Sequence, residues 1–232
     1  MPPIKLQLAI QGGGAKLCAL LAVAEAVQKL EDDQKIRVTR VAGTSAGAIT
    51  ACLLASEQRV DSIRQRLRDR GADFLAQITP PLPFGWLSTW SRIIRGVPLY
   101  DEKKLREFLY ELFPPGKFRT FEQLKRPAIV LTADILNGEK VQYRQTEHIV
   151  VDALANSCAL PFAFRSHRNV GPQPLVDGGI CENLPSDELE ADNEHGPVVG
   201  ISFARTAVPH PPRWLHSTHP ASTVVRQTGP PE

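Results

Sequence analysis

The first sixty residues contain two units in which an apolar strand is followed by a helix. Residues 4–10 are mostly apolar, as in a buried strand, and residues 17–30 carry apolar side chains at helical spacing. A second strand follows at 38–42, and a small, apolar run of helical length occupies 48–56. Consecutive strand–helix units of this kind predict a parallel sheet covered by helices through right-handed crossovers.

Shorter elements follow after residue 100. Asn137 and Gly138 form a dipeptide typical of a hairpin turn, so the runs on either side of it are expected to pair. The predicted elements are, in chain order, a helix at 101–113, strands at 127–133 and 140–145, a helix at 149–160, a strand at 175–177, a short helix at 186–191 and a final buried strand at 198–203. We therefore expect an α/β fold, a three-layer sandwich with a mostly parallel central sheet and helices on both faces.

Two segments interrupt this pattern. Residues 72–97 combine apolar side chains, two tryptophans among them, with prolines and a glycine near the middle. We predict a lid-like insertion or binding surface there, and a packed insertion that covers the core is the alternative. After Arg205, proline, histidine and threonine dominate without periodicity, so residues 205–232 are expected to be a disordered or loosely attached tail. The folded domain is thus predicted at residues 1–204.

Composition narrows the class of protein. With 232 residues, 42% of them apolar, the chain is predicted to form one domain with a substantial core. A formal charge of +2 gives no case for nucleic-acid binding. We expect no transmembrane helix, because no run of about 18 apolar residues exists, and the apolar start is too short for a signal peptide. The scattered cysteines (Cys18, Cys52, Cys158, Cys181) favour buried, reduced thiols and a cytosolic setting.

The richest local signal lies between the second strand and its helix. Gly43-Thr44-Ser45-Ala46-Gly47 matches G-x-S-x-G, in which the serine sits on a sharp bend that exposes its hydroxyl. Gly43 and Gly47 flank the serine where a Cβ would crowd the bend. The helix that follows favours negative charge near the hydroxyl. A glycine-rich turn that merely packs closely is the competing interpretation, because a motif this short recurs by chance.

A glycine loop follows the first strand directly. Gly12, Gly13 and Gly14 precede Ala15 and Lys16, at the start of the predicted helix. The loop matches neither the Walker phosphate motif nor the dinucleotide fingerprint, which would need a glycine at position 17. Consecutive glycines leave backbone N–H groups bare, so the loop is predicted to be an anion or oxyanion cradle, with a flexible turn as the alternative.

A third candidate lies near the end of the predicted domain. The strand at 175–177 ends in Asp177 and is followed by Gly178 and Gly179. Hydrolysis by a serine needs a nucleophile, a base and donors aimed at the developing oxyanion. Candidates for all three roles follow strands of one predicted sheet, and open α/β sheets place their sites at that edge.

Together these motifs resemble those of the patatin-like phospholipases. That family carries a G-G-G-x-[RK]-G loop at its first strand, then a G-x-S-x-G elbow, then D-G-[GA]. The corresponding segments here are 12–17, 43–47 and 177–179, supported by ALANSCALPF at 153–162 and by Asn183 and Pro185. The resemblance covers residues 4–203 and implies a patatin-like fold.

The resemblance also implies a chemistry. Ser45 would be the nucleophile and Asp177 the general base of a dyad, with Gly12, Gly13, Gly14, Ala15 and Lys16 forming the oxyanion and substrate-binding loop. Gly43, Gly47, Gly178 and Gly179 would support these turns. The expected activity is that of a phospholipase A-type esterase acting on acyl esters of membrane lipids through an acyl-enzyme. No metal or cofactor is implied, and a cytoplasmic protein in transient contact with a membrane surface is expected.

Two positions depart from the family pattern. Leu17 replaces the last glycine of the loop, and we expect activity to survive because the amides of Gly13 and Gly14 remain. The tail at 205–232 does not resemble the family, so we expect a shortened or altered C-terminal region and an incomplete lipid-binding surface there.

Two rival functions remain open. The first is an α/β-hydrolase triad of Ser45, Asp177 and His195, in the chain order that such enzymes use. His195 lies in a polar run typical of a turn, which favours a surface histidine. The second rival is a non-catalytic lipid-binding protein on the same fold.

Overall fold

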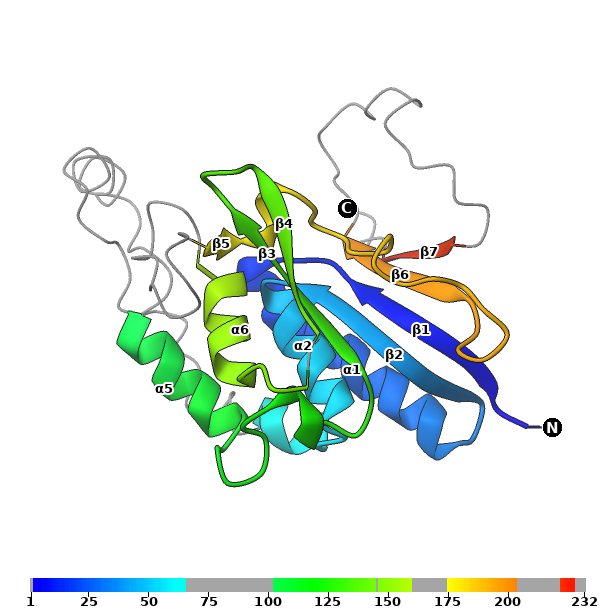
Figure 1. Ribbon diagram of the computed structural model, residues 1–232. Helices are drawn as coiled ribbons and strands as arrows, with labels where there is room; N and C mark the ends of the chain where they lie inside the picture. The colour runs from blue at the N-terminus through cyan, green and yellow to red at the C-terminus, as the bar shows by residue number, and fades with distance from the viewer. Residues whose placement is uncertain (1, 66–101, 145, 160–174, 204–221, 228–232) are drawn as a thin grey trace, which may run out of the picture.

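The computed structural model describes residues 2–65, 102–144, 146–159, 175–203 and 222–227 (Figure 1). The predicted lid-like insertion at 72–97 lies outside the described residues, as does most of the tail predicted at 205–232.

A central sheet of seven strands organises the described part of the chain. Its strands lie in the order β4-β3-β2-β1-β6-β7, and β5 pairs with β3 (Figure 1). Neighbours from β3 across to β7 are parallel, whereas β4 and β5 run antiparallel to β3. The mostly parallel sheet predicted from the sequence is therefore confirmed. The strands span Ile4–Ile10 (β1), Ile36–Thr44 (β2), Ala128–Asp134 (β3), Glu139–Tyr143 (β4), Leu175–Asp177 (β5), Val198–Phe203 (β6) and Ser222–Gln227 (β7).

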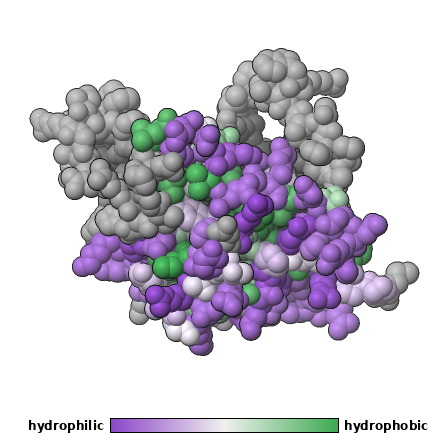
Figure 2. All heavy atoms as spheres, in the orientation of Figure 1, coloured by the Kyte–Doolittle hydropathy of each residue, from purple (hydrophilic) through white to green (hydrophobic). Residues whose placement is uncertain are grey.

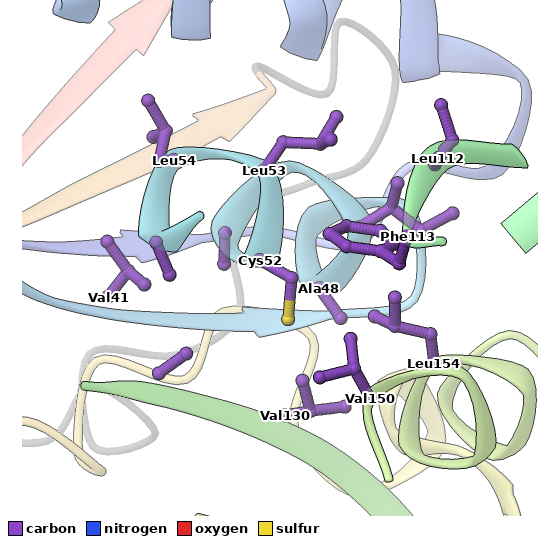
Figure 3. Packing of buried hydrophobic residues seen from close by; sticks show 14 of the residues in the cluster. Val41, Ala48, Cys52, Leu53, Leu54, Leu112, Phe113, Val130, Val150 and Leu154 are labelled. Atoms are coloured by element: carbon purple, nitrogen blue, oxygen red, sulfur yellow. The ribbon is translucent and has the colours of Figure 1, made fainter. Parts of the chain in front are cut away.

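The described helices pack on one face of this sheet. They are α1 (Leu17–Asp32), α2 (Ala46–Ala55), α5 (Glu102–Leu112) and α6 (Val150–Ser157), and residues 60–65 are helical as well. Their apolar side chains join inward-facing residues of β1, β2 and β3 in one cluster. Every residue of α2 is buried, and Figure 3 shows the Cys52 side chain pointing toward Val130 of β3 and Val150 of α6, with Leu53 on the opposite side of the helix. A helix buried on all sides gives a rigid support to the residue just before it.

An irregular segment, residues 181–197, covers part of the opposite face. Leu184 and Leu189 of this segment pack against Ala9, Ala42 and Val198, which point away from the helices. The sequence predicted helices on both faces of the sheet, among them a helix at 186–191. The prediction of that helix is wrong, because these residues form turns in the structure. The reason lies in the hydrogen bonds: the buried Gln7 side chain donates to backbone carbonyls of Glu190 and Gly196, at 2.7 and 2.8 Å, which are therefore held by the sheet.

Strand β3 aligns two strands that approach each other end to end. Along one edge of β3, Thr44 at the end of β2 pairs with Leu131. At the next position Thr132 pairs with Asp177, the last residue of β5. Since β2 is parallel to β3 and β5 is antiparallel to it, the two strands end beside consecutive residues of β3. The register therefore brings the residues after Thr44 next to Asp177.

Two further expectations need correction. The tail contains β7, which pairs in parallel with β6, so the six residues from Ser222 to Gln227 are not the irregular chain that was predicted. The run Thr223-Val224-Val225 is β-branched, which favours an extended backbone. The cysteines are free, as expected, but Cys18 and Cys181 are exposed where burial was predicted. Across the described residues, no helix has both the length and the apolar character needed to cross a membrane.

Candidate active site

Ser45 occupies a strained bend between β2 and α2. Its φ is 54° and its ψ −126°, a combination that side-chain-bearing residues rarely adopt. Strand β2 runs to Thr44 and α2 starts at Ala46, so the bend is tighter than the five-residue turn that the sequence suggested. Ser45 is 8% exposed. This is the backbone geometry of a nucleophile elbow.

The steric role predicted for the elbow glycines is confirmed. A Cβ at Gly43 would lie 2.4 Å from the carbonyl oxygen of Gly47. A Cβ at Gly47 would lie 2.3 Å from the carbonyl oxygen of Ile10. Both contacts are with backbone, which cannot swing aside, so the elbow closes only with glycine at both positions.

Asp177 lies beside Ser45 in a buried setting. The side chain is 4% exposed, and this burial raises the pKa of Asp177 above its ordinary value of 3.8. A hydrogen bond with the Ser45 side chain and another from the backbone N–H of Gly179, at 2.8 Å, partly offset the rise in that pKa. A desolvated carboxylate hydrogen-bonded to a serine is a stronger base than a solvated one.

The glycine loop lies against the elbow. A Cβ added at Gly12 would lie 3.3 Å from the Cβ of Ser45, and the N–H of Gly12 donates to the carbonyl of Asn183 at 2.9 Å. Beyond it, Gly14 begins a 3-10 turn, Gly14–Lys16, with a φ of +47°. Among the described residues the N–H groups of Gly13 and Gly14 have no acceptor. The sequence predicted bare amides in this loop, and their role as oxyanion donors stays a prediction.

At the far end of the loop, Lys16 and Leu17 make contacts outside the predicted substrate-binding site. The ammonium of Lys16 lies 4.5 Å from the centroid of the Phe203 ring, a cation–π contact that turns it toward β6. Leu17, which departs from the family glycine, opens α1 with a φ of −51° and packs against the core. That φ is ordinary for any residue, so position 17 does not require glycine here.

Three residues near Ser45 had no predicted chemical role. Ser157 accepts a hydrogen bond from the backbone N–H of Ser45 at 2.8 Å. The Cys158 thiol has a raised pKa, through burial and the nearby charge of Asp177, while a hydrogen bond with the Ser45 side chain lowers it. The side-chain oxygen of Asn183 occupies the space beside both Gly12 and Gly179. Because the contacts with Ser45 and Gly12 join residues far apart in the sequence, no local pattern could reveal them.

His195 lies at the other edge of the sheet. Its backbone carbonyl accepts a hydrogen bond from Thr39 at 2.6 Å, and its ring pairs with Asp192 at 2.9 Å. Thr39 precedes Ser45 by six residues of an extended strand, which corresponds to about 20 Å. The triad of Ser45, Asp177 and His195 is therefore excluded as an arrangement in this structure.

The site thus belongs to a recognisable class: a mostly parallel α/β sheet with a serine elbow and an aspartate at the carboxyl ends of its strands. The family model "Patatin-like phospholipase" matches residues 8–189. The chain belongs to the patatin-like phospholipase family, which supports a lipid acyl hydrolase activity.

Sequence relatives extend over most of the chain. The uncharacterized protein YqhO of Bacillus subtilis is 28% identical over 207 residues, covering 83% of this chain and 69% of that protein. An uncharacterized NTE family protein of Mycobacterium bovis, Mb2594, is 29% identical over 206 residues, or 88% of this chain. The match spans 31% of the mycobacterial protein, which is much longer.

Solved structures share the fold. VipD from Legionella pneumophila aligns with a TM-score of 0.50 at 19% identity, over 89% of this chain and 51% of that one. ExoU from Pseudomonas aeruginosa, solved in complex with SpcU, aligns with a TM-score of 0.50 at 18% identity, over 97% and 48%. At these identities the likeness concerns the fold alone, and this chain spans about half of each neighbour's length.

Proposed function

We propose that the protein is a serine lipid acyl hydrolase of the phospholipase A type, with a dyad of Ser45 and Asp177. The observation that carries the proposal is the strand register, which ends β2 and β5 beside consecutive residues of β3 and so brings the strained elbow serine next to a buried aspartate, with the glycine loop beside them. The family supports lipid hydrolysis. The assignment of the two residues rests on their geometry and on the raised pKa of Asp177.

The geometry supports a two-step reaction. Asp177 takes the proton of the Ser45 hydroxyl while the oxygen attacks the carbonyl carbon of the ester. The N–H groups of Gly13 and Gly14 stabilise the oxyanion that forms, and the proton then passes to the departing alcohol oxygen. A water molecule, deprotonated by Asp177, then attacks the carbonyl carbon of the acyl-enzyme. The bond to the Ser45 oxygen breaks, that oxygen takes the proton back from Asp177, and a fatty acid is released. Both steps return Asp177 to its starting state, and neither consumes a cofactor.

A peripheral membrane contact is part of this proposal, and the β3–β4 hairpin supports it. At its tip Ile135 and Leu136 are 48% and 72% exposed, although both are large aliphatic residues. The buried Asp134 carboxylate fixes the turn by accepting hydrogen bonds from Leu136 and Asn137. Figure 2 shows hydrophobic surface where this tip lies. The tip extends β3 beyond the strand position that pairs with Asp177, so it projects from the catalytic edge.

The dyad is tested with a fluorophosphonate probe and by lipid mass spectrometry on phosphatidylcholine vesicles. The wild type should be labelled and should release fatty acid, whereas Ser45→Ala should do neither. Asp177→Asn should label far more slowly. A wild type that binds vesicles without labelling or hydrolysis would favour the non-catalytic lipid-binding protein instead.

The membrane contact is tested separately on the same vesicles. Replacing Ile135 and Leu136 by asparagine removes two aliphatic anchors, each worth about tenfold in partitioning. Vesicle binding should fall at least about tenfold, while hydrolysis of a soluble short-chain ester stays unchanged. Leu30→Asn, at the exposed end of α1, is the matched control and should leave vesicle binding unchanged. Equal binding by the double variant and the control would refute the hairpin contact.

A further inference from the structure

The backbone of Ser45 is held by a side chain from another element. Strand β2 ends at Thr44 and α2 begins at Ala46, so the N–H of Ser45 has no partner within either element. That N–H donates instead to the hydroxyl of Ser157 at 2.8 Å. Ser157 is the last residue of α6, is fully buried, and lies 112 positions away in the chain.

The same hydroxyl also reaches the strand that supports the base. Ser157 donates to the carbonyl oxygen of Leu131 at 2.7 Å. Leu131 pairs with Thr44, and the next residue of β3, Thr132, pairs with Asp177. One hydroxyl thus connects the residue that carries the nucleophile to the strand that positions the aspartate.

The Leu131 carbonyl is a contact point for the aspartate turn as well. A Cβ at Gly178 would lie 2.5 Å from this oxygen, so the chain that follows Asp177 packs directly on it. The Ser157 hydroxyl and Gly178 therefore approach the same backbone carbonyl from the two halves of the site. A shift of the Ser45 backbone relative to Leu131 would change the separation of Ser45 and Asp177.

We propose that Ser157 is a positioning residue of the reaction, which fixes the strained backbone of Ser45 at the correct distance from Asp177. The inference rests on the proposed function. Ser157 touches no reacting atom, because its hydroxyl is taken up by two backbone groups. Loss of a fixed near-attack geometry can cost about 10²-fold in rate for a displacement of about 1 Å.

A second buried serine provides a matched control. Ser56, the residue that follows α2, donates to the carbonyl of Leu53 at 2.9 Å, at the end of the helix away from the elbow. Ser56→Ala and Ser157→Ala each remove one buried hydroxyl that donates to a backbone carbonyl. Only the Ser157 change also removes the acceptor for the N–H of Ser45.

The variants are compared by fluorophosphonate labelling rate, by kcat and KM on a soluble short-chain ester, and by thermal unfolding. Ser157→Ala should lower the labelling rate and kcat by about 10- to 100-fold. KM should change little, and the pH midpoint of activity should stay unchanged because Asp177 keeps its surroundings. The labelling rate, kcat and KM of Ser56→Ala should stay within about twofold of the wild-type values, since this change leaves the near-attack geometry intact.

Each outcome decides between a positioning role and a merely structural one. Rates for Ser157→Ala that match those of Ser56→Ala, corrected for folded fraction, would overturn the inference. If Ser157→Ala does not fold, Ser157→Cys replaces it, since sulfur is a weak acceptor of nearly the same size. Slower labelling by Ser157→Cys supports the role, and a wild-type rate refutes it. An unlabelled wild type overturns the proposed function itself, and the positioning role with it.

Discussion

Two glycine-rich turns follow neighbouring parallel strands, and they use glycine in different ways. In the elbow after β2, a Cβ at Gly43 or Gly47 would meet backbone atoms at 2.4 or 2.3 Å. In the loop after β1, a Cβ at Gly14 would meet nothing within 4 Å among the described residues. A Cβ at Gly12 or Gly13 would instead meet the side chain of Asn183 or Phe203, at 2.5 or 2.8 Å. The first turn thus needs glycine against rigid backbone, whereas the second is packed against side chains at its start and is open at Gly14.

The proposed reaction has two requirements, a fixed nucleophile and accessible hydrogen-bond donors, and each turn is suited to one of them. The elbow stores strain at Ser45, and the buried helix α2 and the backbone of β1 hold it in place. In the loop the closest contacts are with side chains rather than backbone, and Gly14 has none within 4 Å among the described residues, so in the proposed function its amides face a developing oxyanion. A rigid nucleophile beside accessible donors is the arrangement that electrostatic catalysis requires.

The largest effect is expected when the elbow loses a glycine. Gly47→Ala places a methyl group 2.3 Å from the Ile10 carbonyl, so β1 and α2 must separate. We expect a loss of roughly 3 kcal/mol of stability, a fall in Tm of about 6–12 °C, and no detectable labelling of Ser45. Thermal unfolding measures the loss of stability, and the fluorophosphonate probe measures the labelling of Ser45.

The matched change in the loop is Gly14→Ala. It meets no clash and costs about 1 kcal/mol for its positive φ, so labelling should persist. If Gly14→Ala and Gly47→Ala reduced stability and labelling to a similar extent, the distinction between the two turns would be wrong.

Removal of the base should affect chemistry and not folding. Asp177→Asn keeps the volume and the hydrogen bond from Gly179, but it cannot take the proton of Ser45. Because general-base catalysis contributes about 10²- to 10⁴-fold, kcat should fall by that factor. Retained hydrolysis in the folded variant would show that another group deprotonates Ser45.

The elbow could be predicted from the sequence because all of its determinants are contiguous. The strand, the two glycines, the serine and the apolar helix lie within about twenty residues, and each follows from local sterics. The glycine loop could be predicted for the same reason. The structure agrees with the steric expectation at the elbow, whereas the role of the loop as an oxyanion cradle stays a prediction.

The aspartate turn was harder to place. The sequence predicts a strand that ends at Asp177, but not that β5 runs antiparallel to β3. A three-residue strand carries too little pattern to reveal its direction. Ser157 could not be found at all, because its two hydrogen bonds reach residues 112 and 26 positions away. Tertiary contacts of this kind leave no periodic signal in the chain.

Activity and stability should respond to pH in opposite directions. Burial raises the pKa of Asp177, so the carboxylate needed as base forms only as pH rises through that raised value, and kcat should rise with it. The native state binds this proton more tightly than the unfolded chain does. Between the ordinary value of 3.8 and the raised pKa, stability should therefore fall as pH increases. Asp177→Asn should remove this component of the Tm–pH curve.

The smallest effect on activity is expected at position 17, where the loop joins α1. Leu17→Gly restores the family glycine, yet the φ of −51° gives glycine no conformational advantage there. The variant should lose about 1 kcal/mol of stability from helix propensity, and somewhat more from the lost packing of the leucine side chain. The labelling rate of Ser45 should stay within about twofold, because the amides of Gly13 and Gly14 are unaffected. A large gain in labelling would mean that the leucine restrains the loop, and the open character assigned to this turn would then be wrong.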